Sequence, residues 1–172
     1  MLAGFGIIAF RDPNGIRPVG MAVRRSPSGG QDHLFASESV VADAAGFTDW
    51  EDVQPGEAII ITRAGVSRRQ CAKPVPFAPD IFEYVYLARP DSVLDGVSVY
   101  RSRMAMGDLL AEEVRRVLAD KNMTVDVVIP VPDTSRVAAL NLAQKLHLPY
   151  REGFVKNRYV GRTFIMPGQQ MR

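Results

Sequence analysis

A short segment between a predicted strand and a predicted helix carries the residues best suited to chemistry. It reads Pro130-Val131-Pro132-Asp133-Thr134-Ser135-Arg136, so a carboxylate and two hydroxyls follow one another directly. In open parallel sheets, ligands bind beyond the carboxyl ends of the strands, where helix N-termini present free N–H groups. Hydroxyl and carboxylate oxygens also suit Mg²⁺, which is usually held by few protein ligands together with substrate phosphates. The alternative is that Thr134 or Ser135 only caps the helix, because both residue types are common caps.

A second segment, Lys156-Asn157-Arg158-Tyr159-Val160-Gly161-Arg162-Thr163, is rich in cations. Its basic side chains alternate with small or aromatic residues, and Gly161 and Gly168 are suited to act as hinges. This pattern is typical of a mobile loop that closes over phosphate, since Lys and Arg form strong charge-assisted hydrogen bonds with phosphate oxygens. A solvated basic loop is the alternative. We expect no nucleic-acid partner, because only Tyr159 and Phe164 offer stacking surfaces nearby.

The composition excludes several other kinds of chemistry. The 172 residues are 47% hydrophobic and 23% charged, which is ordinary for a globular protein. The single cysteine, Cys71, can form no internal disulfide and cannot by itself hold a structural zinc or iron–sulfur site. The apolar run from Met1 to Phe10 is far shorter than a membrane-spanning helix, which needs roughly 20 residues. We therefore expect a soluble, cytoplasmic α/β protein with no membrane partner.

The residues before position 72 predict antiparallel strands joined by sharp turns. Apolar, β-branched stretches predict strands at 6–10, 16–24, 33–36, 57–62 and 66–69. Turns are expected at 12–15, 55–56 and 64–65, where Pro, Asn and Gly gather. A short helix is expected over 40–45, with Ser37 or Ser39 as its N-cap and Gly46 at its end. Three prolines between positions 74 and 79 then predict a stiff connection between two domains.

After this connection the pattern becomes helical and then alternates. Apolar residues at helical spacing predict a helix over 102–121. The continuous apolar run 125–131 predicts a strand that is buried on both faces of a parallel sheet. A helix around 139–146 and a strand at 149–154 follow, so this part is predicted to be a strand–helix–strand unit of a doubly wound sheet. Because the sequence opens in a strand and stops in a basic stretch, we expect a piece of a longer protein.

At these same residues the sequence closely resembles the amidophosphoribosyltransferase family, whose members open de novo purine synthesis. The resemblance covers nearly the whole chain. It rests on the stretches 10–18 (FRDPNGIRP), 36–39 (ASES), 55–58 (PGEA), 83–92 (EYVYLARPDS), 128–135 (VIPVPDTS) and 156–169. Matches that are this long and in the same order are not expected by chance.

The resemblance implies a fold of mixed class, α/β and α+β. Residues 1–75 would be the C-terminal part of a glutaminase domain of the N-terminal-nucleophile type, an αββα sandwich. Residues 80–172 would be the N-terminal part of a type I phosphoribosyltransferase domain with a parallel sheet. In the family, the first domain hydrolyses glutamine. The second joins the ammonia to C1 of phosphoribosyl pyrophosphate, which gives 5-phosphoribosylamine, pyrophosphate and glutamate. Residues 84–92 look like part of the junction between these domains.

The family's site residues carry over to matching positions of this chain. The resemblance implies Mg²⁺ as the cofactor, with Thr134 at the metal-site position. The implied substrate- and nucleotide-binding residues are Ser135, Lys156, Arg158, Tyr159 and Arg162. The last four match a flexible loop that closes over the substrate, and Lys156 and Tyr159 also match positions where purine nucleotides bind as feedback inhibitors. The implied partners are phosphoribosyl pyrophosphate, glutamine, purine nucleotides and, for the full-length protein, further copies of itself.

Two departures from the family limit what we expect of this chain alone. The glutaminase nucleophile, a cysteine that is the first residue of the mature family protein, has no equivalent here, so no catalytic residue is assigned. The Asp-Asp-Ser loop that binds the phosphoribosyl group is also missing. We therefore expect the parent protein to be the enzyme and the isolated piece to be inactive. Asp80 stands where some members have a ligand of an iron–sulfur cluster, so we expect no such cluster.

Two other functions stay open on the sequence alone. The first is a non-catalytic nucleotide- or phosphate-binding module, which measurable nucleotide binding by a natural product ending at Arg172 would favour. The second is a basic RNA-binding module, a poorer hypothesis that would need a steep salt dependence of the affinity for RNA.

Overall fold

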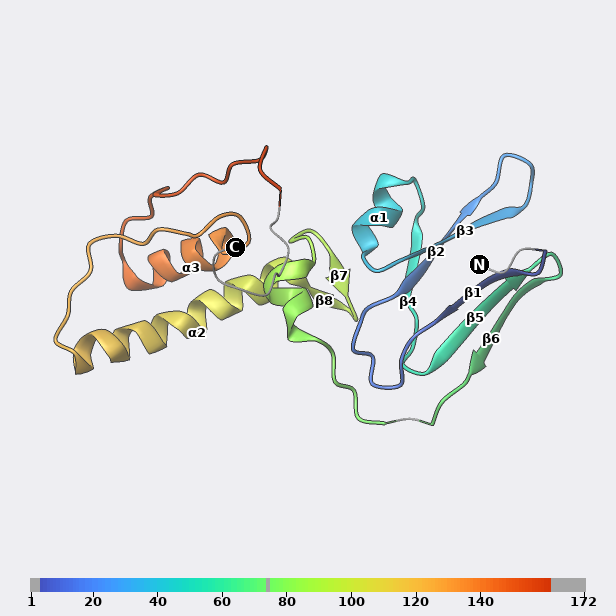
Figure 1. Cartoon of the computed structure of the whole chain (residues 1–172), viewed down its shortest axis with the longest axis horizontal. Coiled ribbons are helices and arrows are strands. Elements are labelled where there is room, and N and C mark those ends of the chain that lie inside the picture. The colour runs from blue at the N-terminus through green and yellow to red at the C-terminus, as the bar shows by residue number, and fades with distance from the viewer. Residues whose placement is uncertain (1–3, 74, 162–172) are drawn as a thin grey trace, which may run out of the picture. The chain divides into compact units, whose positions relative to one another are not determined.

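The computed structural model describes residues 4–73 and 75–161, and these form two compact units that divide between Met106 and Gly107. The first unit contains, in order, β1 (Gly6–Phe10), β2 (Gly20–Arg25), β3 (Gln31–Ala36), α1 (Ser39–Ala44), β4 (Asp49–Asp52), β5 (Glu57–Thr62), β6 (Gly65–Gln70), a π-helical turn (Glu83–Leu87), β7 (Val93–Leu94) and β8 (Val97–Ser98). Helix α2 (Val99–Asp120) begins in the first unit and continues into the second, which also contains α3 (Arg136–Leu146) (Figure 1).

Two antiparallel sheets make up most of the first unit. One has the strand order β1-β5-β6 and the other the order β3-β2-β4. The predicted hairpin is confirmed, because Thr62 of β5 pairs with Gly65 of β6 across a two-residue turn. The turn at 12–15 is also confirmed: the Gly15 N–H donates to the Asp12 carbonyl at 3.0 Å, and Gly15 has a φ of +65°, which favours glycine.

The side chains of the second sheet alternate between two small cores. Met21 of β2 and its cross-strand partner Phe35 pack with Val53 and with Ile59 of β5, so this core lies between the two sheets. The next residue of β2, Ala22, faces the other way and packs with Ala42 of α1 and with Phe47. Successive strand residues point to opposite faces, so one strand can serve both cores. The result is a helix, a sheet and a second sheet in adjacent layers.

The predicted N-cap of the first helix is wrong. Helix α1 begins at Ser39 with Glu38 in the N-cap position, and no side chain caps the helix. The Ser39 hydroxyl instead accepts a hydrogen bond from the Val93 N–H at 3.0 Å. The predicted end is confirmed, since Gly46 follows the helix with a φ of +72°. A hydroxyl near a helix start predicts a cap only where no other donor reaches it.

A small lobe follows the proline-containing stretch and still belongs to the first unit. It comprises the π-helical turn, the β7–β8 hairpin and the start of α2, and its own core is formed by Ala88, Leu94 and Val99. Arg103 of α2 is 3% exposed and donates to the carbonyls of Tyr84 and Ala88 at 2.8 and 2.7 Å. These contacts make residues 83–103 one body.

In the second unit the helices are confirmed, but the predicted buried strand is not. Val128 and Tyr150 form a single parallel bridge, with hydrogen bonds of 2.9 Å from Val128 N–H to the Pro149 carbonyl and 3.1 Å from Arg151 N–H to the Val128 carbonyl. The parallel direction is as predicted. The side chain of Ile129 nevertheless stays 43% exposed and that of Val131 69% exposed. A parallel strand becomes buried only when neighbours flank it and helices cover it, and among the described residues the run 125–131 has one short neighbour.

Two further findings concern the chain as a whole. The division between the units falls inside α2, and the domain boundary predicted at residues 75–80 stays a prediction. Within the described part of the chain, neither long helix is apolar enough to cross a membrane.

Candidate functional site

The predicted phosphate site lies where residues 130–135 lead into α3. Ser135 occupies the N-cap position of α3, but its hydroxyl donates to the Val131 carbonyl and does not cap the helix. The alternative of a simple Ser135 cap is therefore wrong. Thr134 is half-buried beside it. An α3 N-terminus without a side-chain cap presents backbone N–H groups to an anion.

Lys156 is brought to this turn from further along the chain. The parallel bridge at Val128 and Tyr150 sets residues 150–156 beside residues 128–133. The Lys156 Nζ atom lies 3.7 Å from Asp133 Oδ2, while Arg136 Nη2 lies 3.8 Å from the other oxygen of the same carboxylate. Arg136 also pairs with Glu152 at 3.3 Å. The four side chains are each 45–58% exposed, so these ion pairs are weak and both cations stay available to a phosphate.

Three of the predicted site residues therefore lie together. Thr134, Ser135 and Lys156 gather at the start of α3. Arg158 and Tyr159 continue along the same exposed segment, where Tyr159 is 100% exposed and its N–H donates to the Asn157 side chain at 2.9 Å. Arg162 lies outside the described residues.

The oxygen ligands at this turn fit Mg²⁺ only in company with a substrate. Among the described residues there is no group of three or more His, Cys, Asp or Glu side chains that could hold a metal ion. Asp133 is the carboxylate next to Thr134, and it forms only weak ion pairs with Arg136 and Lys156. Mg²⁺ commonly binds through one or two protein oxygens with the rest supplied by phosphates and water. The turn matches that arrangement and does not match a metal cage made by the protein alone.

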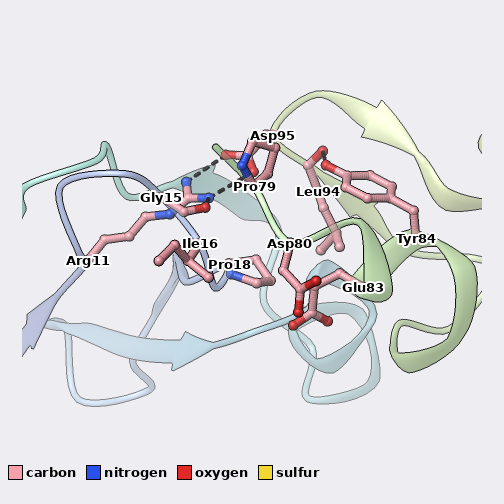
Figure 2. A pocket seen from close by; sticks show the side chains of 10 residues that line it. All are labelled: Arg11, Gly15, Ile16, Pro18, Pro79, Asp80, Glu83, Tyr84, Leu94 and Asp95. Carbon is pink, nitrogen blue, oxygen red and sulfur yellow. Dashed lines mark hydrogen bonds and ion pairs between the residues drawn. The ribbon is translucent and has the colours of Figure 1, made fainter. Parts of the chain in front are cut away.

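A second polar centre, which the sequence did not predict, surrounds Arg11 at the end of β1. Its Nη1 and Nη2 atoms donate to the two oxygens of Asp95 at 2.6 and 2.8 Å (Figure 2). The remaining donors reach the carbonyls of Gly15, Arg17 and Val53 at 3.0–3.1 Å. Only 4% of Arg11 is exposed, and the hydrogen bond to Asp95 raises the pKa of Arg11 despite this burial. The sequence predicted only the turn that follows Arg11. It could not predict the ion pair, because Asp95 lies 84 residues away along the chain.

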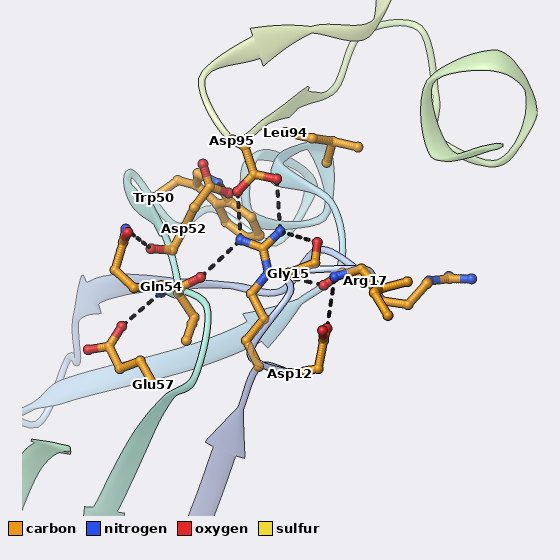
Figure 3. Close-up of polar contacts among 12 residues, drawn as sticks. Asp12, Gly15, Arg17, Trp50, Asp52, Gln54, Glu57, Leu94 and Asp95 are labelled. Atoms are coloured by element: carbon orange, nitrogen blue, oxygen red, sulfur yellow. Dashed lines mark hydrogen bonds and ion pairs between the residues drawn. The ribbon is translucent and has the colours of Figure 1, made fainter. Parts of the chain in front are cut away.

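The immediate surroundings of the Arg11 guanidinium are packed. Asp12 is occupied locally: its carboxylate accepts the N–H groups of Asn14 and Ile16, each at 2.9 Å. Figure 3 places Asp52 close to Asp95 at this centre. Burial, followed by the charge of Asp95, raises the pKa of the Asp52 carboxyl. The crevice between Arg11, Pro79 and Tyr84 has no room for a water molecule.

Comparison with solved structures gives the class of protein. No protein-family model matches the sequence. The chain is similar to the glutamine phosphoribosylpyrophosphate amidotransferase from B. subtilis complexed with ADP and GMP, with a TM-score of 0.76 and 37% identity over 96% of this chain and 34% of that one. It is equally similar to an allosteric regulatory enzyme of purine biosynthesis, with a TM-score of 0.76 and 36% identity over 97% of this chain and 33% of that one. The fold is thus the mixed α/β fold of one segment of these amidotransferases.

Sequence comparison then gives the particular relatives. The chain is 56% identical to the amidophosphoribosyltransferase of Pseudomonas aeruginosa over 173 residues, 54% to that of Saccharomyces cerevisiae over 182 residues and 53% to that of Escherichia coli over 173 residues. Each comparison covers 100% of this chain and 34% of the relative, so the chain spans about a third of the length of these proteins. The chain is related to amidophosphoribosyltransferases over its whole length, and the resemblance stated from the sequence is confirmed.

Proposed function

We propose that this chain is a segment of an amidophosphoribosyltransferase, the enzyme of the first committed step of purine biosynthesis. The reaction uses glutamine, water and phosphoribosyl pyrophosphate, and yields 5-phosphoribosylamine, glutamate and pyrophosphate. The observation that carries the proposal is the 53–56% identity to three enzymes of this name along the entire chain. We further propose a cytoplasmic, homo-oligomeric full-length protein that uses Mg²⁺ and has no iron–sulfur cluster.

Two domains would share the reaction. Residues 1–75 would belong to the glutaminase domain, and the layering of α1 on one sheet and of that sheet on a second supports an αββα sandwich. The far face of the β1-β5-β6 sheet carries exposed apolar residues, with Phe10 of β1 75% exposed, and a further helical layer would cover such a face. Residues 80–172 would begin the phosphoribosyltransferase domain, in agreement with the parallel bridge between Val128 and Tyr150.

The residues around the start of α3 would bind the phosphates of phosphoribosyl pyrophosphate. The backbone N–H groups of α3 and the hydroxyl of Thr134 would donate to phosphate oxygens, and Lys156 would exchange its weak ion pair with Asp133 for a stronger bond to phosphate. Thr134 and Asp133 would hold Mg²⁺ together with the substrate. When bound, the ion neutralises the charge of the departing pyrophosphate. Lys156 would add positive charge at the same place, which lowers the barrier further.

Purine nucleotides would compete for the same residues. A solved relative was complexed with ADP and GMP. In this chain Lys156 would bind a nucleotide phosphate, and the fully exposed ring of Tyr159 would offer a stacking face to the base. Inhibition by nucleotides would then be relieved by high concentrations of phosphoribosyl pyrophosphate.

Kinetics of a lysine variant of the full-length protein test the site. We expect Lys156→Ala to raise the KM for phosphoribosyl pyrophosphate about tenfold, because a charge-assisted bond to phosphate is lost. The matched control is Lys145→Ala, which removes a cation from the last turn of α3, where Lys145 lies 3.7 Å from Asp108. The control is expected to leave the KM within about twofold. Equal KM values for the two variants would show that Lys156 does not bind phosphoribosyl pyrophosphate.

A further inference from the structure

Two sets of polar contacts, centred on the buried side chains of Ser92 and Arg11, attach the lobe of residues 83–103 to the sheets of the first unit. In the first set, one oxygen of the Glu38 carboxylate accepts hydrogen bonds from the Arg89 N–H and from the Ser92 hydroxyl, both at 2.8 Å. Next to it, the Ser39 hydroxyl accepts the Val93 N–H at 3.0 Å. Ser92 is completely buried there. Glu38 sits at the N-cap of α1 but bonds the lobe instead of its own helix.

The second set is the pair of Arg11 and Asp95. Asp95 lies in the turn between β7 and β8 with a φ of +50°, a left-handed conformation that is uncommon for residues other than glycine. Figure 3 places this turn over the loop that contains Gly15 and over Asp52. Because Arg11 holds Asp95 by two parallel hydrogen bonds, it fixes both the position and the direction of the turn. The same guanidinium holds three carbonyls on the sheet side.

These contacts are better suited to orientation than to stability. Burying charged groups is unfavourable, and apolar residues of similar size often stabilise such a place as well or better. Hydrogen bonds, in contrast, are directional. Those made by the side chains of Arg11, Glu38, Ser92 and Asp95 therefore define one arrangement of the lobe. The crevice between Arg11, Pro79 and Tyr84 leaves no space for a ligand, whereas a separate pocket of about 370 Å³ is lined by Asp52, Gln54, Pro55, Phe77 and Asp95. The hydrogen bonds of Arg11, Glu38, Ser92 and Asp95 nevertheless join the lobe to the sheets directly, so these side chains set the position of the lobe.

We propose that Arg11, Glu38, Ser92 and Asp95 are positioning residues that couple glutamine hydrolysis to transfer of its ammonia. The inference rests on the proposed function, in which residues 1–75 and residues 80–172 serve successive half-reactions. The lobe is the first part of the chain after the connection at 72–80, and it leads directly into α2. With the lobe fixed on the sheets, ammonia released from glutamine reaches C1 of the pentose. With the lobe loosened, glutamine is still hydrolysed but ammonia escapes to water.

The test compares two nitrogen donors in the full-length protein. Phosphoribosylamine synthesis is measured with glutamine and, separately, with saturating ammonium chloride, together with glutamate release. The variants are Asp95→Asn and Ser92→Ala. Their matched controls are Asp32→Asn, which alters an exposed ion pair with Arg24 at 3.1 Å, and Ser28→Ala in the exposed loop before β3. Thermal unfolding of every variant is recorded alongside.

We expect the ratio of glutamine-driven to ammonia-driven synthesis to fall at least about fivefold in both variants, because each loses a hydrogen bond to a charged group. Glutamate release should then exceed synthesis, and both controls should keep the wild-type ratio. A ratio that is unchanged in Ser92→Ala would overturn the inference, even if Asp95→Asn does not fold. Parallel losses with both donors would also overturn it, since a merely structural role predicts them. A wild-type protein that makes no phosphoribosylamine with glutamine and none with ammonium chloride would instead overturn the proposed function, and the inference with it.

Discussion

Arg11 shows how a residue in a recognisable motif can serve structure and not chemistry. Every donor of its guanidinium is used inside the protein, by Asp95 and by carbonyls of the neighbouring loops. Lys carries one ammonium group with three donors and cannot reproduce the two parallel bonds to a carboxylate. Sequence alone could identify the turn after Arg11 from Pro13 and Gly15. It could not identify the partner, which lies on a hairpin that no local pattern connects to β1.

Arg11→Lys should therefore lower the free energy of unfolding by about 3 kcal/mol, the lower end of the loss found when one partner of a buried ion pair is removed, because Lys keeps the charge but loses the paired hydrogen bonds. Chemical denaturation of the full-length protein measures this, followed through a transition of the first unit. Arg116→Lys is the control, because Arg116 forms exposed pairs with Glu113 and Asp120 on α2. The control should change stability by less than about 1 kcal/mol. Similar losses in the two variants would mean that Arg11 is not the centre of a buried network.

The pH dependence of stability should report the buried carboxylate of Glu83. Burial raises the pKa of Glu83, although the Arg17 guanidinium, whose Nε lies 2.6 Å away, opposes the shift. The folded state thus holds the proton more tightly than the unfolded state. This contribution to stability is present at low pH and is lost as the pH rises from the ordinary pKa of Glu to the raised folded value.

Glu83→Gln cannot titrate, so its stability relative to wild type should increase as the pH rises through that window and then level off. Denaturation midpoints at a series of pH values measure the difference between the two proteins. Glu113→Gln, at a half-exposed site of α2, serves as the control for removal of a carboxylate. A wild-type protein that gains stability over Glu83→Gln with rising pH would show that the ion pair with Arg17 outweighs burial.

At the scale of elements, local patterns predicted those strands and helices whose own residues decide them. The strand at 57–62 was predicted with its bounds, because the apolar run of β5 is enclosed by Pro55-Gly56 and Ala64-Gly65. Strand β4 was missed, because Asp49-Trp50-Glu51-Asp52 is acidic and becomes a strand only by pairing with β2. For residues 125–131 the error was the opposite one: a buried strand was predicted and is not found. Their composition is that of a buried strand, but burial depends on neighbours that the described residues do not supply.

The contact between α2 and α3 gives a prediction at this scale. A Cβ on Gly107 of α2 would lie 2.5 Å from the carbonyl oxygen of Ala138 and 3.0 Å from the Cβ of Asn141. Replacing Gly by Ala inside a helix normally stabilises it by up to about 1 kcal/mol. Here the close approach of the two helices should reverse the sign, with Gly107→Ala lowering stability by about 1–2 kcal/mol through overpacking. Thermal unfolding followed by helical circular dichroism measures the change. A stabilised variant would mean that the helices pack less closely.

At the scale of the whole molecule, the candidate site could be predicted only in part. The hydroxyls at 134 and 135 stood out from their place before a helix, and the parallel arrangement of 125–131 and 149–154 was predicted, but the approach of Lys156 to Asp133 was not. The roles of these residues came from the resemblance. The chain covers about a third of the length of its relatives, and the nucleophile and phosphoribosyl loop that the resemblance implies match no part of it.

Residues 1–172 on their own are accordingly expected to release no glutamate from glutamine. Cys71 is the sole cysteine, it is exposed, and its thiol donates to the Arg69 carbonyl at 3.6 Å. The measurement is glutamate release by the purified piece against a buffer control. Release above that control would contradict the assignment of the nucleophile to another part of the protein.

The most direct test of the central claim follows the nitrogen itself in the full-length protein. Glutamine labelled with ¹⁵N at its amide is supplied with phosphoribosyl pyrophosphate and Mg²⁺, and the products are analysed by mass spectrometry. The account predicts a phosphoribosyl product that carries ¹⁵N, with one pyrophosphate and one glutamate for each molecule formed. Pyrophosphate release that does not depend on glutamine, or the absence of any ¹⁵N-labelled pentosyl product, would contradict it.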